Sequence, residues 1–144
     1  MTLHATVNVQ ASGFTDTAVV NGGSYAYQVA AFSVFGEGPR TPVATAQRGT
    51  APGAPRTPTA VTGPKGITLK WAAPSSNGGA AVTAYRVFRS TSSGTEAFLV
   101  SVGGSTLTYV DKAVTKKTKY FYWITAVNIL GEGAHSTEVS ATAR

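Results

Sequence analysis

Hydrophobic and polar residues alternate with a period of two through much of the second half of the chain. The clearest alternating positions are Ile67, Leu69, Trp71, Tyr120, Tyr122, Ile124 and Ala126. A period of two places such residues on one face of a β-strand. The pattern predicts strands, separated by turns, at residues 59–62, 67–71, 82–90, 98–102, 107–110, 119–128 and 138–143. Seven short strands in about ninety residues are typical of a two-sheet antiparallel sandwich, so the predicted fold class is all-β.

The chain contains an internal repeat, found by shifting the sequence 95 positions from residue 14 to residue 109. Residues 14–38 then align without a gap with residues 109–133. The identical positions are Asp16/Asp111, Ala18/Ala113, Val19/Val114, Tyr25/Tyr120, Tyr27/Tyr122, Ala31/Ala126 and the Gly-Glu-Gly segments 36–38 and 131–133. The repeat predicts three parts: the C-terminal half of a repeat at 1–47, a Pro/Gly linker at 48–57 and a complete domain at 58–144.

The first copy is expected to be an incomplete sandwich. An alternation of Leu3, Ala5, Val7 and Val9 with polar residues predicts one strand, which counterparts of the last three strands of the second copy follow. Counterparts of the first three strands are missing. An uncovered sheet face invites association, so this half-repeat is expected to pair with another chain or to be held by other contacts.

The second copy resembles a fibronectin type III domain. The matching segments are Ile67–Trp71, Tyr85–Arg89, Thr118–Tyr120 and Ala126–Gly133. The resemblance covers residues 55–144 fully and 1–48 as a C-terminal half. It implies an immunoglobulin-like two-sheet antiparallel sandwich in tandem.

The resemblance also assigns structural roles. Trp71 matches the core tryptophan of the family, and Tyr120 its tyrosine corner, a role that Tyr25 repeats. The Ala-, Thr- and Gly-rich texture is similar to copies in secreted bacterial proteins. Integrin binding is not implied, because Ile129–Gly133 stands where integrin-binding members carry Arg-Gly-Asp.

Composition narrows the classes of function. The chain has no cysteine, which excludes disulfides and thiolate metal sites. No apolar run reaches the roughly 20 residues of a membrane span. Residues 1–4 lack the features of a signal peptide, so any export signal is expected elsewhere.

Catalysis and cofactor binding are not predicted. The acids are Asp16, Glu37, Glu96, Asp111, Glu132 and Glu138, and four of these form two repeat-equivalent pairs. Such recurrence favours hydrogen bonding at turns and strand ends over acid–base chemistry. The histidines, His4 and His135, lie one in each copy. No catalytic, cofactor-binding or metal-binding residue is therefore predicted, although a weak calcium site stays open.

An outward-facing aromatic strip is the sharper candidate site. If Tyr120 and Tyr122 point inward, Phe121 and Trp123 point outward, beside Arg86 and Phe88 of the neighbouring strand. Flat aromatic faces stack on sugar rings or anchor protein partners. The alternatives are that Arg86 covers Trp123 by cation–π stacking, or that the strip is simple cross-strand packing.

A lysine cluster is the second candidate. Lys112, Lys116, Lys117 and Lys119 correspond to the neutral residues Thr17, Asn21, Gly22 and Ser24 of the first copy. The fold therefore does not require the charge. The cluster is interpreted either as an anion patch for an acidic polymer or as a solvated loop in a chain of net charge +6.

Three functional hypotheses follow, none of them enzymatic. The first is a spacer, presentation and protein-interaction module of a secreted or cell-surface multidomain protein, with neighbouring domains of the same polypeptide as partners. The alternative is an accessory module that binds carbohydrate, such as a polysaccharide or cell-wall polymer, through the aromatic strip. The third is self-association through the incomplete first repeat. Neither nucleic-acid binding nor a membrane span is expected.

Overall fold

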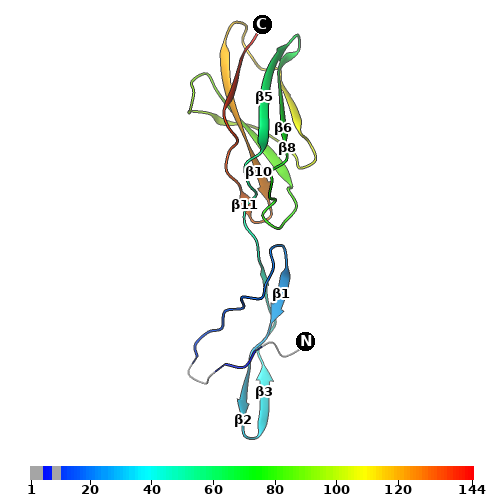
Figure 1. Cartoon of the computed structure of the whole chain (residues 1–144), viewed down its shortest axis with the longest axis vertical. Coiled ribbons are helices and arrows are strands. Elements are labelled where there is room, and N and C mark those ends of the chain that lie inside the picture. Colours follow the sequence, from blue (N-terminus) through cyan, green and yellow to red (C-terminus); the bar gives the residue numbers. More distant parts are fainter. Residues whose placement is uncertain (1–4, 8–10) are drawn as a thin grey trace.

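A computed structural model describes residues 5–7 and 11–144 (Figure 1). Every regular element among these residues is a β-strand. The chain forms two units that lie end to end along the long axis of the molecule, and the C-terminus lies at the far end of the second unit. The all-β prediction is confirmed.

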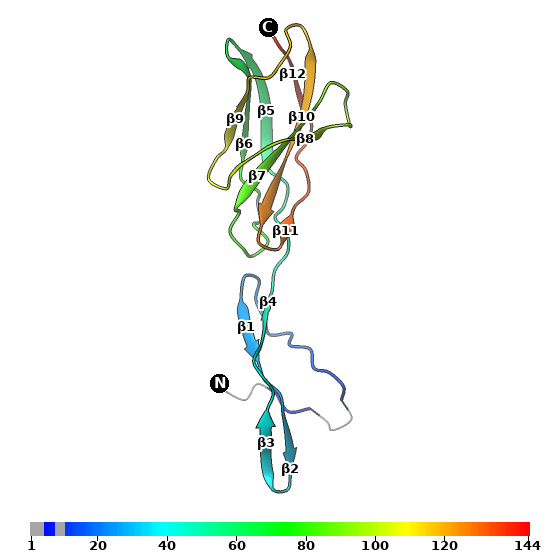
Figure 2. The same cartoon turned by 180° about the vertical axis from the view of Figure 1, so that it is seen from behind.

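The second unit is a sandwich of two antiparallel sheets. One sheet has the order β5-β6-β9, and the other has the order β11-β10-β7-β8 with β12 also beside β10 (Figure 2). The strands are β5 Arg56–Gly63, β6 Gly66–Ala72, β7 Ala84–Ser90, β8 Ala97–Gly103, β9 Thr108–Asp111, β10 Lys119–Asn128, β11 Gly131–Glu132 and β12 Val139–Thr142. These bounds confirm the predicted strands, and β5 begins at Arg56, inside the predicted linker.

The core lies between the two sheets, where the alternation predicted it. Ile67, Leu69, Val87, Tyr122 and Ile124 are each at most 1% exposed. They come from β6, β7 and β10, the central strands of their sheets. Burial of these side chains, each contributing roughly 1.5–3 kcal/mol, is the main force that closes the sandwich.

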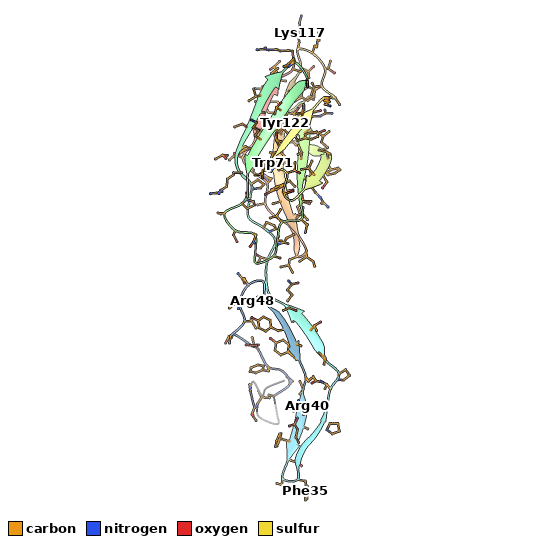
Figure 3. All side chains as sticks on the ribbon, turned by 90° about the vertical axis from the view of Figure 1, so that its right-hand side faces the viewer. Phe35, Arg40, Arg48, Trp71, Lys117 and Tyr122 are labelled. Atoms are coloured by element: carbon orange, nitrogen blue, oxygen red, sulfur yellow. The ribbon has the colours of Figure 1, made fainter. Side chains whose placement is uncertain are left out.

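Trp71 belongs to this core, as the resemblance implied. Its side chain is 5% exposed and meets Tyr85 edge to face, with the ring centroids 5.6 Å apart. Figure 3 shows Trp71 and Tyr122 inside the second unit. Both residues are therefore part of the interior, and neither is available to a ligand.

The first unit repeats the last part of the sandwich. Its strands are β1 Ser24–Tyr27, β2 Ala30–Ser33, β3 Gly36–Arg40 and β4 Ala44–Gln47, with β1 paired to β4 and β2 to β3. The registers match those of the second unit: Ser24 faces Gln47 as Lys119 faces Thr142, and Ser33 faces Gly36 as Asn128 faces Gly131. The repeat in the sequence is thus also a repeat in strand pairing.

Two expectations about the first unit differ from the structure. Residues 13–16, the counterpart of β9, are not a strand. Since β9 pairs with β6, and β6 has no counterpart in the first unit, nothing is present for residues 13–16 to pair with. Of the alternation from Leu3 to Val9, residues 3, 4, 8 and 9 lie outside the described residues, and Ala5–Val7 are not in a strand.

The first unit has no enclosed core. Up to Thr50, no residue that the structure describes is buried. Its large apolar side chains face outward, and Phe14, Phe32 and Phe35 are 52%, 68% and 98% exposed. No strand of the described part of the first unit covers these side chains.

Candidate functional site

The tyrosine corner occurs in both units. The phenol oxygen of Tyr120 accepts a hydrogen bond from the backbone N–H of Thr115 at 3.0 Å. In the first unit, Tyr25 accepts one from the N–H of Val20 at 2.8 Å. Each bond fixes the turn five residues before the tyrosine, so the predicted structural role of both tyrosines agrees with these contacts.

A buried carboxylate organises the polar interior of the second unit. Asp111 is fully buried and accepts hydrogen bonds from the Tyr122 hydroxyl at 2.9 Å, Nη1 of Arg89 at 2.9 Å and the N–H of Ala113 at 3.1 Å. Burial, followed by the charge of Asp111, raises the pKa of Tyr122, so this phenol stays protonated and donates. The carboxylate is fully engaged in holding strands together.

Asp16 repeats this arrangement in the first unit. It accepts from the N–H of Ala18 at 2.9 Å and from the Tyr27 hydroxyl at 3.0 Å. The recurring aspartates therefore serve turn and strand-end hydrogen bonding, as the repeat predicted.

The predicted aromatic strip lies on the outer face of the β10–β7–β8 sheet. Trp123 faces Phe88 across the strands, with their ring centroids 6.3 Å apart, and Phe88 meets Phe98 edge to face at 5.9 Å. Phe88, Phe121 and Trp123 are half-buried, whereas Phe98 is 58% exposed. Phe121 lies beyond Trp123 on β10, under the Lys119 ammonium, which is 4.9 Å from its ring centroid.

The neighbours of this strip differ from the expected ones. The His135 ring stacks on Trp123, with the centroids 4.7 Å apart and the planes 22° apart. The Arg86 guanidinium instead forms an ion pair with Glu132 of β11 at 2.7 Å. The suggestion that Arg86 covers Trp123 by cation–π stacking is therefore not the observed packing, because Glu132 holds the guanidinium.

A shallow hollow adjoins the strip. It has a volume of about 410 Å³ and is lined by Arg86, Phe88, Phe98, Ser101 and Glu132. The lining combines the apolar rings of Phe88 and Phe98 with the Arg86–Glu132 ion pair. Sequence reasoning named Arg86 and Phe88 but missed the other three, although the position of Phe98 at the start of a predicted strand was the available signal.

The lysine cluster lies at the end of the second unit far from the first. Lys112, Lys116 and Lys117 are exposed in the loop between β9 and β10, and Lys119 opens β10. Figure 3 shows Lys117 at this extremity. None of the four lysines lines the hollow, although Lys119 lies over Phe121 of the aromatic strip.

Glu96 is a buried acid that sequence reasoning did not single out. It is 8% exposed, and neither of its carboxylate oxygens meets the geometry of a hydrogen bond, although Glu138 and the backbone of Gly94 lie near enough to shift its pKa. Burial, and then Glu138, raises the pKa of Glu96, while Glu96, Gly94 and Ser93 lower the pKa of Glu138. Glu138 also accepts from the Ser93 hydroxyl and the Gly94 N–H, both at 2.9 Å, and so holds the β7–β8 loop.

In residues 5–7 and 11–144, no three His, Asp or Glu side chains gather where a metal ion could be held. Within the same ranges no helix is long and apolar enough to cross a membrane.

The joint between the two units is built from backbone and glycine. The N–H of Thr50 donates to the carbonyl of Gly78 at 2.9 Å, and the Asn128 amide donates to the carbonyls of Thr50 and Asn77, both at 2.8 Å. The turn at Gly22 packs against Gly79. The resemblance gave no reason to expect that Asn128 would bond the linker residue Thr50 and the β6–β7 loop.

Comparison with known proteins identifies the family. The sequence model described as "Fibronectin type III domain" matches residues 53–142, and the chain belongs to this family. Exoglucanase B of Cellulomonas fimi is 30% identical over 142 residues, which cover 92% of this chain and 12% of that protein.

Two solved structures are similar as well. A "Fn3-like protein" from Clostridium thermocellum is 30% identical, covers 66% of this chain and 96% of its own, and has a TM-score of 0.56. A β-1,2-glucanase from Parabacteroides distasonis is 28% identical, with a TM-score of 0.57 over 66% of this chain and 13% of its own. Modules of this family thus occur within much longer proteins, including glycoside hydrolases.

Arg89→Met should destabilise the second unit by about 3 kcal/mol, because it leaves the Asp111 carboxylate buried without its cation. Arg86→Met is the matched control: it removes an arginine of the same strand whose ion pair is exposed, at a cost of about 1 kcal/mol or less. Urea unfolding measures both free energies. Equal losses would contradict the structural role assigned to Asp111.

Glu96 should make the stability of the second unit depend on pH. Its pKa in the fold lies above the ordinary 4.5, so its stabilising contribution is complete below pH 4.5 and is lost as the pH rises through the folded pKa. Glu138, whose pKa is lowered, contributes with the opposite sign and loses its contribution as the pH falls. Glu96→Gln should therefore gain free energy of unfolding relative to the natural protein between pH 4.5 and about pH 7.

Urea titrations at both pH values provide the test, with Glu37→Gln as the control. Glu37 is exposed and pairs with Arg40. If Glu96→Gln tracked the natural protein at both pH values, Glu96 would not be the titrating group.

Proposed function

We propose that this chain is a non-catalytic spacer that holds neighbouring domains of a secreted or cell-surface polypeptide at a set distance and orientation. The supporting observation is the joint. A spacer that transmits orientation needs a connection that resists bending, and a Pro/Gly linker alone does not provide one.

The resistance comes from Asn128, which is 4% exposed. Its amide donates to Thr50 in the linker and to Asn77 in the β6–β7 loop, while its oxygen accepts from the N–H groups of Leu130 and Gly131. One side chain thereby ties the linker to two loops of the second unit. Because Thr50 is bonded to the second unit and Arg48 is bonded to Gly22 and Gly23 of the first, the first unit is held on the axis of the second (Figure 1).

The relatives support this proposal. In exoglucanase B and the β-1,2-glucanase, the matching region is a small part of a much longer enzyme. The buried carboxylate of Asp111 is committed to structural hydrogen bonds, which suits a module without chemistry of its own.

Asn128→Asp tests the joint. The carboxylate keeps both acceptor bonds but cannot donate to Thr50 or Asn77, and losing such bonds to buried carbonyls costs roughly 1–3 kcal/mol. In the natural protein, one alignment tensor should fit the residual dipolar couplings of both units. The variant should need two tensors.

Thr83→Val is the control. Its hydroxyl donates to the carbonyl of Val127, a bond within the second unit. A natural protein that already needed two tensors would refute the spacer proposal.

The hollow on the outer sheet face favours a second candidate function, the binding of a glucan chain. A sugar ring could stack on the exposed face of Phe98 beside Phe88, while its hydroxyls hydrogen-bond to Arg86 and Glu132. Two of the similar proteins are named for action on glucans, which suggests the class of ligand.

Phe98→Ala should lower the affinity for soluble β-glucan at least about tenfold, because it removes the exposed stacking face. Phe35→Ala is the matched control, since Phe35 is 98% exposed but lies on the hairpin of the first unit. Affinity electrophoresis in β-glucan gels measures the shift. Equal retardation of both variants and the natural protein would exclude this hollow as the site.

A further inference from the structure

The two units present the same backbone at their equivalent ends. In each unit a turn precedes the strand that carries the tyrosine corner, at residues 20–23 before β1 and 115–118 before β10. Each turn is hydrogen-bonded to the residue that follows the last strand of its unit, Arg48 after β4 and Ala143 after β12. The matching bonds are Gly22 N–H to Arg48 O (2.6 Å) and Lys117 N–H to Ala143 O (2.8 Å), Gly23 to Val20 (3.1 Å) and Thr118 to Thr115 (3.2 Å), and Arg48 to Gly23 (3.0 Å) and Ala143 to Thr118 (2.9 Å). We call residues 20–23 with Gly49 the tip of the first unit, and residues 115–118 with Arg144 the tip of the second unit.

The tip turn itself does not require glycine. Gly22 has φ 81°, and its equivalent Lys117 has φ 62°, so both adopt the left-handed conformation. Lys117 shows that a side chain can occupy this turn. The reason for glycine at position 22 must therefore lie in what packs against it.

The tip of the first unit packs directly on the second unit. A Cβ atom at Gly22 would overlap the carbonyl oxygen of Gly79. A Cβ atom at Gly49 would overlap Cδ1 of Leu130 and lie 2.8 Å from the carbonyl oxygen of Gly78. At both positions the facing group includes backbone, which cannot swing away as a long side chain does.

Both positions carry cations at the tip of the second unit. The equivalent of Gly22 is Lys117, and the equivalent of Gly49 is Arg144; both are exposed. Figure 3 places Lys117 at the end of the molecule opposite Phe35 and far from Arg48 at the joint. The two tips thus share a backbone conformation. They differ at the two positions that pack against the second unit in the joint, which are glycine in the first tip and a cation in the second.

We propose that Gly22 and Gly49 are specificity residues of the joint: the Gly78–Gly79 loop accepts only a repeat whose tip has glycine at both positions. The tip of the second unit, with Lys117 and Arg144, does not dock on another copy of that loop. This inference rests on the rigid joint of the proposed function. It also specifies which repeats can form such a joint.

The first test places the residues of the second tip into the first. Gly22→Lys combined with Gly49→Arg should uncouple the units of the full chain, so that ¹⁵N relaxation gives separate rotational correlation times for residues 24–47 and 56–142. Gly94→Lys is the control, because Gly94 also has a left-handed φ of 76° but nothing lies within 4 Å of an added Cβ.

A second test keeps the proposal falsifiable if the double variant misfolds. The full chain is extended after Arg144 by a copy of residues 50–144. The added unit should tumble independently, and Lys117→Gly with Arg144→Gly should couple it to the unit before it.

The outcomes separate the two proposals. If the units of the natural chain already tumble independently, the rigid spacer and this inference both fail. If the natural chain is rigid but the Gly22→Lys/Gly49→Arg chain remains rigid, or if the added unit docks without the glycine substitutions, only the specificity assigned to Gly22 and Gly49 fails.

Discussion

The contact between the turn at Gly22 and the loop at Gly78–Gly79 is the constraint on which the arrangement of this molecule depends. Backbone meets backbone there, so the separation of the units is set by peptide groups rather than by flexible side chains. Asn128 bonds the linker to the adjacent loop and makes the contact directional. These bonds tie a segment rich in proline and glycine to the second unit.

Within each unit, a second constraint is an aspartate that accepts a hydrogen bond from the tyrosine two residues after the tyrosine corner. Asp111 and Asp16 accept a tyrosine hydroxyl and a turn N–H in the same way, although only the second unit encloses a core. Arg89 balances the buried charge of Asp111. The local hydrogen bonds of the half-repeat therefore persist without the packing that normally surrounds them.

Pleating places alternate side chains of β10 on opposite faces of its sheet. On β10, Tyr122 and Ile124 enter the core, while Trp123 lies outside and is half-covered by His135. The part of this face left accessible is shifted toward Phe98 and the Arg86–Glu132 pair. A ligand would meet an aromatic edge and an ion pair rather than the whole aromatic strip.

The resemblance to fibronectin type III domains assigned the tyrosine corners. Period-two alternation and the internal repeat determined the strands and the core positions Trp71 and Tyr122, because pleating depends on nearby residues. They did not show that β9 needs β6 as a partner, and so the strand-like counterpart at 13–16 was wrong. The stacking of His135 on Trp123, the pairing of Arg86 with Glu132 and the glycine contacts of the joint were decided only by tertiary structure. Each joins segments far apart in the chain, and no spacing rule within one strand specifies which distant groups will meet.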